Sequence, residues 1–200
     1  MMKKLRYGNT NTFFLEGSNG GLLIDTDYVG TLSAFFRAIK AAGITVREIS
    51  YVMATHYHPD HMGLISELME MDIRLLLIDT QKEHVHFSDH ILMREPTLRY
   101  KPINESLATM ISCEESRSFL DGIGIKGEII STPSHSADSV SVMLDNGQCF
   151  VGDLEHEAVI SGYESNEALQ NDWSRVMSFQ PKQVYFAHAN ETEYTCEAKE

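Results

Sequence analysis

The stretch that most constrains this chain is THYHPDH, residues 55–61, which places three histidines and one aspartate within six positions. It follows ISYVMA, a short apolar run of β-forming residues that predicts a buried strand. Residues two apart in an extended segment point to the same side, so His56 and His58 present two imidazoles to one point. Asp60 and His61 stand where the apolar spacing of DHMGLISELMEM predicts a helix, and they could hold a second cation.

A structural interpretation of the same stretch is open, in which Asp60 caps the helix and the histidines are solvated loop residues. Three histidines in six positions nevertheless favour metal binding. Other candidate ligands follow predicted strands: His135 in STPSHSADS, Asp153 in FVGDLE and His188 in YFAHAN. Each alone is more often structural than functional. Metal sites in layered folds are built from loops that converge on one edge, and we therefore interpret these residues as one set.

Hydrophobic patterning predicts an α/β chain with one domain over residues 1–200. Two apolar runs flank the turn signal at residues 18–21 and predict a hairpin that ends near Asp25. GTLSAFFRAIKAAG and NEALQNDWSRVMSF have helical spacing, whereas IRLLLID, GEIISTP, SVSVMLD, QCFVGD and QVYFAHA predict strands. Asn146-Gly147 is a hairpin signal between SVSVMLD and QCFVGD. Hairpins together with strand and helix alternation predict mixed sheets.

The charge balance limits the possible partners. Sixteen Lys and Arg residues against 29 Asp and Glu residues give a net charge of -13, which disfavours nucleic acid and anionic lipid surfaces. We find no apolar run of signal-peptide or membrane-spanning length, and we therefore expect a cytoplasmic protein with a small-molecule substrate and no membrane partner. A homo-oligomer stays open. The three cysteines, Cys113, Cys149 and Cys196, lack CxxC spacing and are interpreted as free thiols.

HxHxDH at residues 56–61, followed in order by His135, Asp153 and His188, resembles the motif signature of the metallo-β-lactamase superfamily, with Asp25 of LLIDT as the fifth motif. The resemblance extends from Asn11 to His188. It implies an α/β fold, a four-layer αββα sandwich with two mixed β-sheets and a dinuclear metal site along one edge. The chain departs from the family at Ser134, where glycine is frequent, so the local turn could differ.

The resemblance also implies a role for each matching residue. His56, His58 and His135 would bind the first metal ion, Asp60, His61 and His188 the second, and Asp153 would bridge them, with Asp25 supporting the histidine loop from behind. The implied cofactors are two divalent metal ions, with zinc the first expectation and iron or manganese as alternatives.

This ligand set implies a dinuclear metal-dependent hydrolase in which a metal-bridging hydroxide attacks an ester, lactone or thioester carbonyl. Asp60 would have an additional catalytic role, because a carboxylate beside the attacked carbon can carry a proton to the leaving group. Three alternatives stay open because a shared fold does not select the reaction. They are a phosphodiesterase, an iron-dependent oxidoreductase such as a sulfur dioxygenase-like enzyme, and a non-catalytic metal-binding regulator.

Substrate choice is expected to depend on residues 81–116, the longest segment near the ligand loops without a clear pattern. We expect this segment to cover the metal site and to contact substrate, with Tyr100 as the hydroxyl donor. A surface excursion that packs only on itself is the alternative. In HVHFSDH, His84, His86 and His90 are interpreted as a solvated face or a pocket wall rather than a third metal site. GIGIKG opens no predicted helix and is not interpreted as a phosphate loop.

Overall fold

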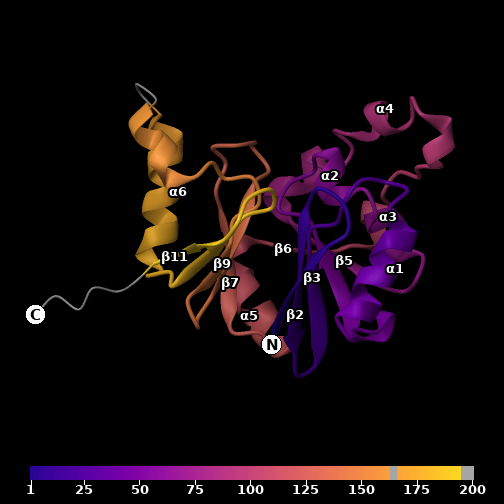
Figure 1. Ribbon diagram of the computed structural model, residues 1–200, viewed down its shortest axis with the longest axis horizontal. Coiled ribbons are helices and arrows are strands. Elements are labelled where there is room, and N and C mark those ends of the chain that lie inside the picture. The colour runs from indigo at the N-terminus through magenta and orange to yellow at the C-terminus, as the bar shows by residue number, and fades with distance from the viewer. Residues whose placement is uncertain (163–165, 195–200) are drawn as a thin grey trace, which may run out of the picture.

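The computed structural model describes residues 1–162 and 166–194 and places two β-sheets face to face (Figure 1). The first sheet has the strand order β1-β2-β3-β4-β5-β6. Strands β1 to β3 pair antiparallel, and strands β3 to β6 pair parallel, so this sheet is mixed. Its strands are β1 (Met2–Arg6), β2 (Asn11–Gly17), β3 (Gly20–Ile24), β4 (Ile49–Met53), β5 (Arg74–Ile78) and β6 (Thr109–Ile111).

The second sheet is mixed as well, with the order β11-β10-β9-β8-β7. Only β9 and β10 pair parallel, and the other neighbours are antiparallel. The predicted turn at Asn146-Gly147 joins β8 to β9, and Gly147 has the positive φ of 90° that such a turn needs. The strands are β7 (Gly127–Ser131), β8 (Val140–Leu144), β9 (Gln148–Phe150), β10 (Gln183–Tyr185) and β11 (Thr192–Glu193).

Helices cover the outer face of each sheet, as Figure 1 shows with α1 on one side and α6 on the other. Phe35 and Ile39, one turn apart on α1 (Leu32–Ala41), pack with α3 (Ile65–Met69) against the first sheet. Trp173 and Val176 of α6 (Glu167–Ser178) pack on the second sheet. The four-layer αββα arrangement expected from the sequence is therefore confirmed.

The layers follow from the alternation of side chains along each strand. In β3, Leu22 and Ile24 point into the core between the sheets, whereas Leu23 points toward the helices of the first sheet. Across the inter-sheet core, the Phe13 and Phe150 rings lie 4.9 Å apart between centroids. Fully burying an aromatic ring of this size contributes about 1.5–3 kcal/mol, so this core holds the two sheets, and the loops at their edges, in register.

The helix predicted directly after the histidine cluster is divided into α2 (Pro59–Met62) and α3, with Gly63 between them. The carbonyl oxygen of His61 accepts hydrogen bonds from the Thr26 N–H at 2.9 Å and the Thr26 hydroxyl at 3.1 Å, and Leu64 N–H donates to that hydroxyl at 3.2 Å. These backbone groups are thus unavailable to a continuous helix. A Cβ at Gly63 would lie 2.3 Å from the Val29 nitrogen, so only glycine permits this close approach.

Segment 81–116 contains short elements and then enters a helix that the hydrophobic pattern did not predict, α5 (Cys113–Gly122). A capping box begins α5, because Glu115 N–H donates to the Ser112 hydroxyl and Ser112 N–H donates to the Glu115 carboxylate. In Figure 1, α4 stands at the upper right, beyond α2. The short elements of the chain are η1 (Val46–Glu48), η2 (Asp79–His84), α4 (Asp89–Leu92), η3 (Pro96–Leu98), η4 (Glu105–Leu107) and η5 (Glu157–Gly162).

Within residues 1–162 and 166–194, no helix combines the length and the apolar character that crossing a bilayer requires.

Candidate metal centre

The ligand candidates meet at one edge of the sandwich because several strands end there. Strands β7, β9 and β10 of the second sheet have their carboxyl ends on this edge, as the antiparallel β7–β8 and β8–β9 pairs and the parallel β9–β10 pair require. The loops after them carry His135, Asp153 and His188, and the loop after β4 of the first sheet carries the histidine cluster. All seven predicted ligand residues are brought together here.

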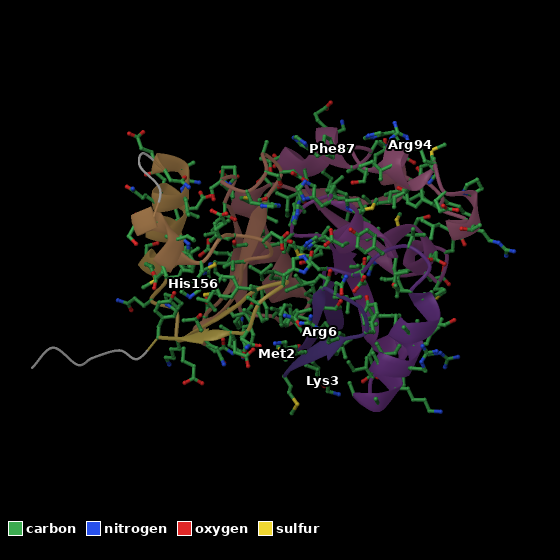
Figure 2. The ribbon with its side chains drawn as sticks, turned by 45° about the horizontal axis from the view of Figure 1, so that its top comes forward. Met2, Lys3, Arg6, Phe87, Arg94 and His156 are labelled. Atoms are coloured by element: carbon green, nitrogen blue, oxygen red, sulfur yellow. The ribbon has the colours of Figure 1, made fainter. Side chains whose placement is uncertain are left out.

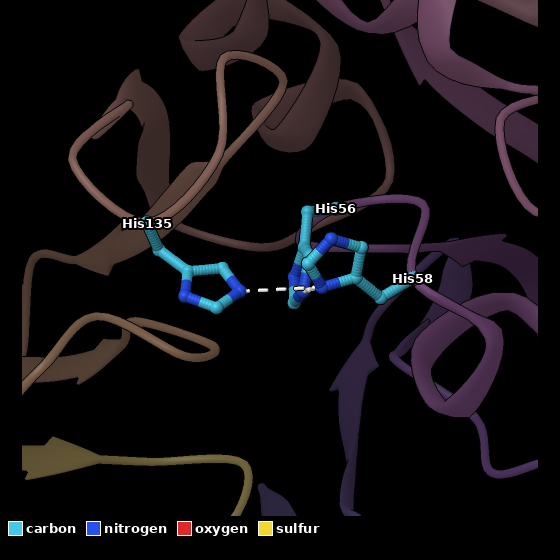
Figure 3. Close-up of side chains that lie close together, drawn as sticks. All are labelled: His56, His58 and His135. Atoms are coloured by element: carbon cyan, nitrogen blue, oxygen red, sulfur yellow. Dashed lines mark hydrogen bonds between the residues drawn. The ribbon is translucent and has the colours of Figure 1, made fainter.

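The first ligand group combines side chains from both sheets, as Figure 3 shows for its three histidines. His56 Nε2 lies 2.9 Å from His58 Nδ1, and His135 Nε2 lies 3.3 Å from the same nitrogen. His56 is fully buried, whereas His58 and His135 reach toward solvent. One face of this group is therefore open to a ligand from outside.

The second ligand group lies beside the first and contains Asp60, His61 and His188. His188 Nε2 is 3.1 Å from Asp60 Oδ2 and 3.3 Å from His61 Nε2. Asp60 is the second residue of α2, after Pro59, and His58 rather than Asp60 occupies the N-cap position. The capping role considered for Asp60 is therefore not the one observed.

The carboxylate of Asp153 lies between the two groups. Its Oδ2 is 3.8 Å from His56 Nε2 and 3.7 Å from His135 Nε2. Its Oδ1 is 3.4 Å from His61 Nε2 and 3.3 Å from His188 Nε2. Within the part of the chain that the structure describes, Oδ1 is buried and has no hydrogen-bond partner. Burying a carboxylate oxygen without a hydrogen-bond donor costs free energy, and a bound cation would offset this cost.

The spacing of the donor atoms fits metal ions. Two ligands at the usual Zn–N distance from a tetrahedral ion stand about 3.3 Å apart, which follows from bond lengths of about 2.0–2.1 Å. The nitrogen and oxygen pairs within the two groups are 2.9 to 3.4 Å apart where they are closest. Imidazole and carboxylate donors suit zinc, iron and manganese alike. The residues present therefore fit a pair of divalent cations.

Burial and charge set the protonation of the buried histidines. Burial, reinforced by the neighbouring histidines, lowers the pKa of His56 to about 2, so its imidazole is neutral and can donate a lone pair. Burial alone would also lower the pKa of His61, but the carboxylates of Asp25 and Asp153 outweigh it and raise that pKa to about 10. A cation bound at His61 Nε2 must therefore displace a proton, which couples metal binding to pH.

The two carboxylates of the groups are held in the ionised form. Burial would raise the pKa of Asp60, but the hydrogen bond from His188 and the charge of His61 lower it overall. The pKa of Asp153 is likewise lowered, because the neighbouring histidines outweigh its burial. Both side chains thus present negative charge to the site at neutral pH.

Asp25 supports the histidine loop from behind. Its Oδ1 accepts a hydrogen bond of 2.6 Å from Thr55 N–H, and its Oδ2 lies 3.1 Å from His61 Nδ1. This contact places the Nδ1 proton of His61 on the Asp25 side and turns Nε2 toward the second ligand group. Asp25 has a φ of 59°, an uncommon backbone conformation that aspartate tolerates better than most residues. Asp25 therefore contacts both the loop that carries His56 and the ring of His61.

Two buried side chains outside the predicted set connect the ligand loops. The side-chain amide of Gln81 donates to the carbonyl oxygens of Ala54 at 3.0 Å, Thr55 at 3.2 Å and Asp138 at 3.1 Å. It thereby joins the loop that carries His56 to the loop that carries His135. A lone glutamine after the apolar run IRLLLID has no periodic signal, so the sequence does not distinguish it from a loop residue.

Asp138 makes the second connection between these loops. Its carboxylate accepts hydrogen bonds from Tyr57 N–H at 2.7 Å and from the Ser136 hydroxyl at 2.8 Å. Aspartate in a serine-rich loop is a known signal for such backbone contacts, and SHSADS contains it. The signal predicts a local turn, however, and not a contact with a residue 81 positions away.

The other side chains considered from the sequence, which include Tyr100, three histidines and two cysteines, lie outside the two ligand groups. The Tyr100 hydroxyl donates to Asp89 at 2.6 Å, so it is engaged within segment 81–116 rather than with a ligand residue. His86 lies between the carboxylates of Asp89 and Glu105. The groups of potential metal ligands found among the described residues include none of His84, His86 and His90. Cys113 and Cys149 are free thiols, and Cys196 lies outside the described residues.

Comparison with known proteins agrees with this geometry. Residues 5–188 match the family model described as the metallo-beta-lactamase superfamily. The beta-lactamase-like protein 2 homolog of Drosophila melanogaster is 22% identical over 195 residues, which cover 90% of this chain and 59% of that protein. An atrochrysone carboxyl ACP thioesterase of Aspergillus fumigatus is 27% identical over 145 residues, covering 72% of this chain and 29% of that protein. The chain thus spans less than two thirds of either relative.

Solved structures share the fold. A metallo-beta-lactamase family protein of Thermus thermophilus superposes with a TM-score of 0.73 at 18% identity, covering 96% of this chain and 74% of that one. TTHA1623, solved in a di-iron-bound form, superposes with a TM-score of 0.69 at 23% identity, covering 100% and 97% of the two chains. At 18% and 23% identity, this similarity shows a shared fold and not a shared function.

Proposed function

Since this chain belongs to the metallo-β-lactamase superfamily, we propose that it is a dinuclear metal-dependent hydrolase of an ester, lactone or thioester. The observation that carries the proposal is the placement of Asp153. One oxygen of its carboxylate faces His56 and His135, and the other faces His61 and His188. A carboxylate shared in this way suits two cations held side by side, which is the arrangement of two-metal hydrolases.

Two divalent cations, when bound, would polarise the substrate carbonyl and activate the attacking water. In the net reaction, water adds to the acyl carbon and the bond from that carbon to the leaving oxygen or sulfur breaks. One proton of the water goes to the leaving group, and the acid product ionises. A side chain that carries this proton would accelerate the reaction.

Asp60 is suited to that role. It is partly exposed at the open side of the second ligand group, and His188 holds its Oδ2 at 3.1 Å. Its lowered pKa keeps it ionised before the reaction, so it can accept the proton of water. The carboxylate can then pass this proton to the leaving oxygen or sulfur.

The comparisons support an acyl substrate over a phosphodiester. One relative is named a thioesterase, which is a protein that cleaves thioesters. The net charge of -13 disfavours polyanionic substrates such as nucleic acid, because it repels them at a distance. A small neutral acyl compound meets no such repulsion.

An iron-dependent oxidoreductase is the second candidate, and one observation favours it. TTHA1623, which shares this fold, was solved with two iron ions. Imidazole and carboxylate donors accept iron as well as zinc, so the donor set does not select between the two reactions. The identity of the bound metal is therefore the decisive measurement.

The test is metal analysis of protein purified without added metal, followed by assays with ester, lactone, thioester and phosphodiester substrates. We expect two metal ions per chain and turnover of at least one carbonyl substrate. Protein that holds a single ion, with no second ion taken up from added zinc, would contradict the dinuclear assignment. Bound iron with oxygen consumption and no hydrolysis would favour the oxidoreductase. Metal binding without turnover of any substrate would favour a regulator.

A further inference from the structure

A cavity of about 170 Å³ lies directly beside the first ligand group. Its wall includes His58, so the cavity and the ligand group share a side chain. His84 and Phe87 of segment 81–116 form another part of the wall, and Ala137 and Asp138 of the loop after β7 form a third part. The cavity thus lies where the open face of the ligand group meets segment 81–116.

The lining of this cavity suits an uncharged, apolar group. The Phe87 ring has its centroid 6.2 Å from that of His58 and is 58% exposed, so a bound group can cover it. Among the described residues, no lysine or arginine lines the cavity. The one acidic side chain, Asp138, is already engaged with Tyr57 N–H and the Ser136 hydroxyl.

In the proposed hydrolysis, the position of Asp60 decides which part of the substrate lies in the cavity. This proton carrier belongs to the second ligand group, beside His188. The leaving group receives the proton, so it must lie on the side of the second group. The acyl part of the same substrate then lies on the side of the first group, where His58 forms the cavity wall.

We propose that the cavity beside His58 binds the acyl chain of the substrate, that this chain is apolar and uncharged, and that Phe87 is its main contact. This inference rests on the proposed hydrolase function. Figure 2 shows Phe87 at the end of the surface segment nearer the centre of the molecule, with Arg94 farther out. Phe87 lines the cavity and is therefore a specificity-determining residue, whereas Met93 and Arg94 are not among the cavity-lining residues.

The first test compares acyl thioesters that share one thiol and differ only in the acyl chain, acetyl against hexanoyl. The wild-type protein is expected to favour hexanoyl in kcat/KM. Phe87→Ala should lower the ratio of hexanoyl to acetyl kcat/KM by about tenfold, the usual scale for apolar contacts in a pocket. Met93→Ala is the matched control, because Met93 is 61% exposed on the same segment and does not line the cavity. The proposal is overturned if Phe87→Ala leaves the ratio unchanged or if Met93→Ala lowers it equally.

The second test does not need turnover and so separates this inference from the proposed function. Hexanamide, which resembles the acyl part and resists hydrolysis, is titrated into the protein, and backbone amide NMR shifts are recorded with acetamide as the reference. Hexanamide should shift residues 84–87 and 136–138, and Phe87→Ala should weaken its binding. If this result is obtained while no thioester or ester is hydrolysed, the cavity assignment stands and the hydrolase assignment fails. Hexanamide shifts that avoid these residues would overturn the cavity assignment.

Discussion

The ligand loops and segment 81–116 meet beside His58, but different interactions hold them. The ligand loops are tied by buried polar groups: Gln81 donates to three carbonyl oxygens, and Asp25 accepts from Thr55. Beyond Gln81, segment 81–116 buries Val85 and Leu92 in the core, and its exposed side carries charge pairs such as His86 with Glu105 and Lys101 with Glu70. Buried hydrogen bonds are costly to lose, whereas exposed ion pairs contribute at most about 1 kcal/mol.

The two regions have different proposed roles, metal binding for the ligand loops and substrate contact for the cavity wall. The donor atoms of the two ligand groups must keep their spacing to within a few tenths of an ångström for a metal to bind. The wall that contacts substrate has no such requirement and can accept substitutions on an exposed surface. Substitutions in the ligand loops should therefore affect metal binding and folding, whereas substitution of Phe87, where segment 81–116 lines the cavity, should affect substrate choice.

The largest effect is expected from Asp153→Asn, which removes the charge that faces both ligand groups. Residues that only orient metal ligands cost 10–100-fold in affinity when replaced, so this change should cost at least about a hundredfold and reduce hydrolysis to background. Metal content by mass spectrometry and steady-state rates are the measurements. Asp145→Asn, at an exposed carboxylate paired with Arg117, is the matched control and should change neither. Two tightly held ions in Asp153→Asn would show that this residue does not bridge.

The next effect concerns Asp60→Asn, which keeps a ligand oxygen but removes the proton carrier. If general acid–base transfer contributes its usual 10²–10⁴-fold, kcat should fall by about that factor while KM changes little. Metal content must be measured on the same sample, since a lower rate with lost metal would have another cause. An unchanged kcat in a variant with both ions would remove Asp60 from the mechanism.

The sequence predicted the fold and the gathering of the seven candidate ligands at one edge, because these residues lie in segments that follow apolar runs typical of strands. The long ordered series from Asp25 to His188 also restricts the topology, since every member must reach one edge. Short-range patterns were less informative where a long-range contact decides the local structure. The break at Gly63 is an example, because it depends on Thr26, which contacts the chain from another strand end.

The surroundings of Tyr100, Gln81 and Asp138 were not predicted, for a related reason. Tyr100 has a side chain suited to contacting substrate, but its partner is Asp89, eleven positions earlier, and no pattern indicates that pairing. Gln81 and Asp138 connect loops that are distant in sequence, and a single polar residue carries no periodicity. Such contacts depend on tertiary packing, which hydrophobic patterning does not specify.

An intermediate effect is expected from Gln81→Leu, which tests whether buried bonds hold the ligand loops. The change removes one donor from each of three carbonyl oxygens, of which, among the described residues, only that of Thr55 keeps another donor, Val140 N–H, and we expect the free energy of unfolding to fall by about 2–3 kcal/mol. Denaturant unfolding measures this loss, and metal affinity should fall with it. Gln170→Leu on the exposed face of α6 is the matched control and should be nearly neutral. Equal stability of the two variants would show that Gln81 does not hold these loops.

The smallest effect is expected from His86→Gln, which removes the exposed pairs of His86 with Asp89 and Glu105. Slight burial would lower the pKa of His86, but hydrogen bonds to Asp89 and Glu105 outweigh it and raise that pKa above its unfolded value. A raised pKa means that the folded state binds the proton more tightly, so the stabilisation is fully present below about pH 6.5 and is lost as the pH rises through the folded pKa. His86→Gln should therefore lower the free energy of unfolding by less than about 1 kcal/mol at pH 5.5 and by almost nothing at pH 9. The ligand histidines titrate in the variant and in the wild type alike, so their contribution cancels in this difference.

His90→Gln is the control, since the ring nitrogen of His90 contacts only the Phe87 carbonyl oxygen among the described residues. A loss that is larger at pH 9 than at pH 5.5 would contradict this account, and a loss above about 2 kcal/mol would show that the exposed pairs of His86 contribute as much as a buried hydrogen bond.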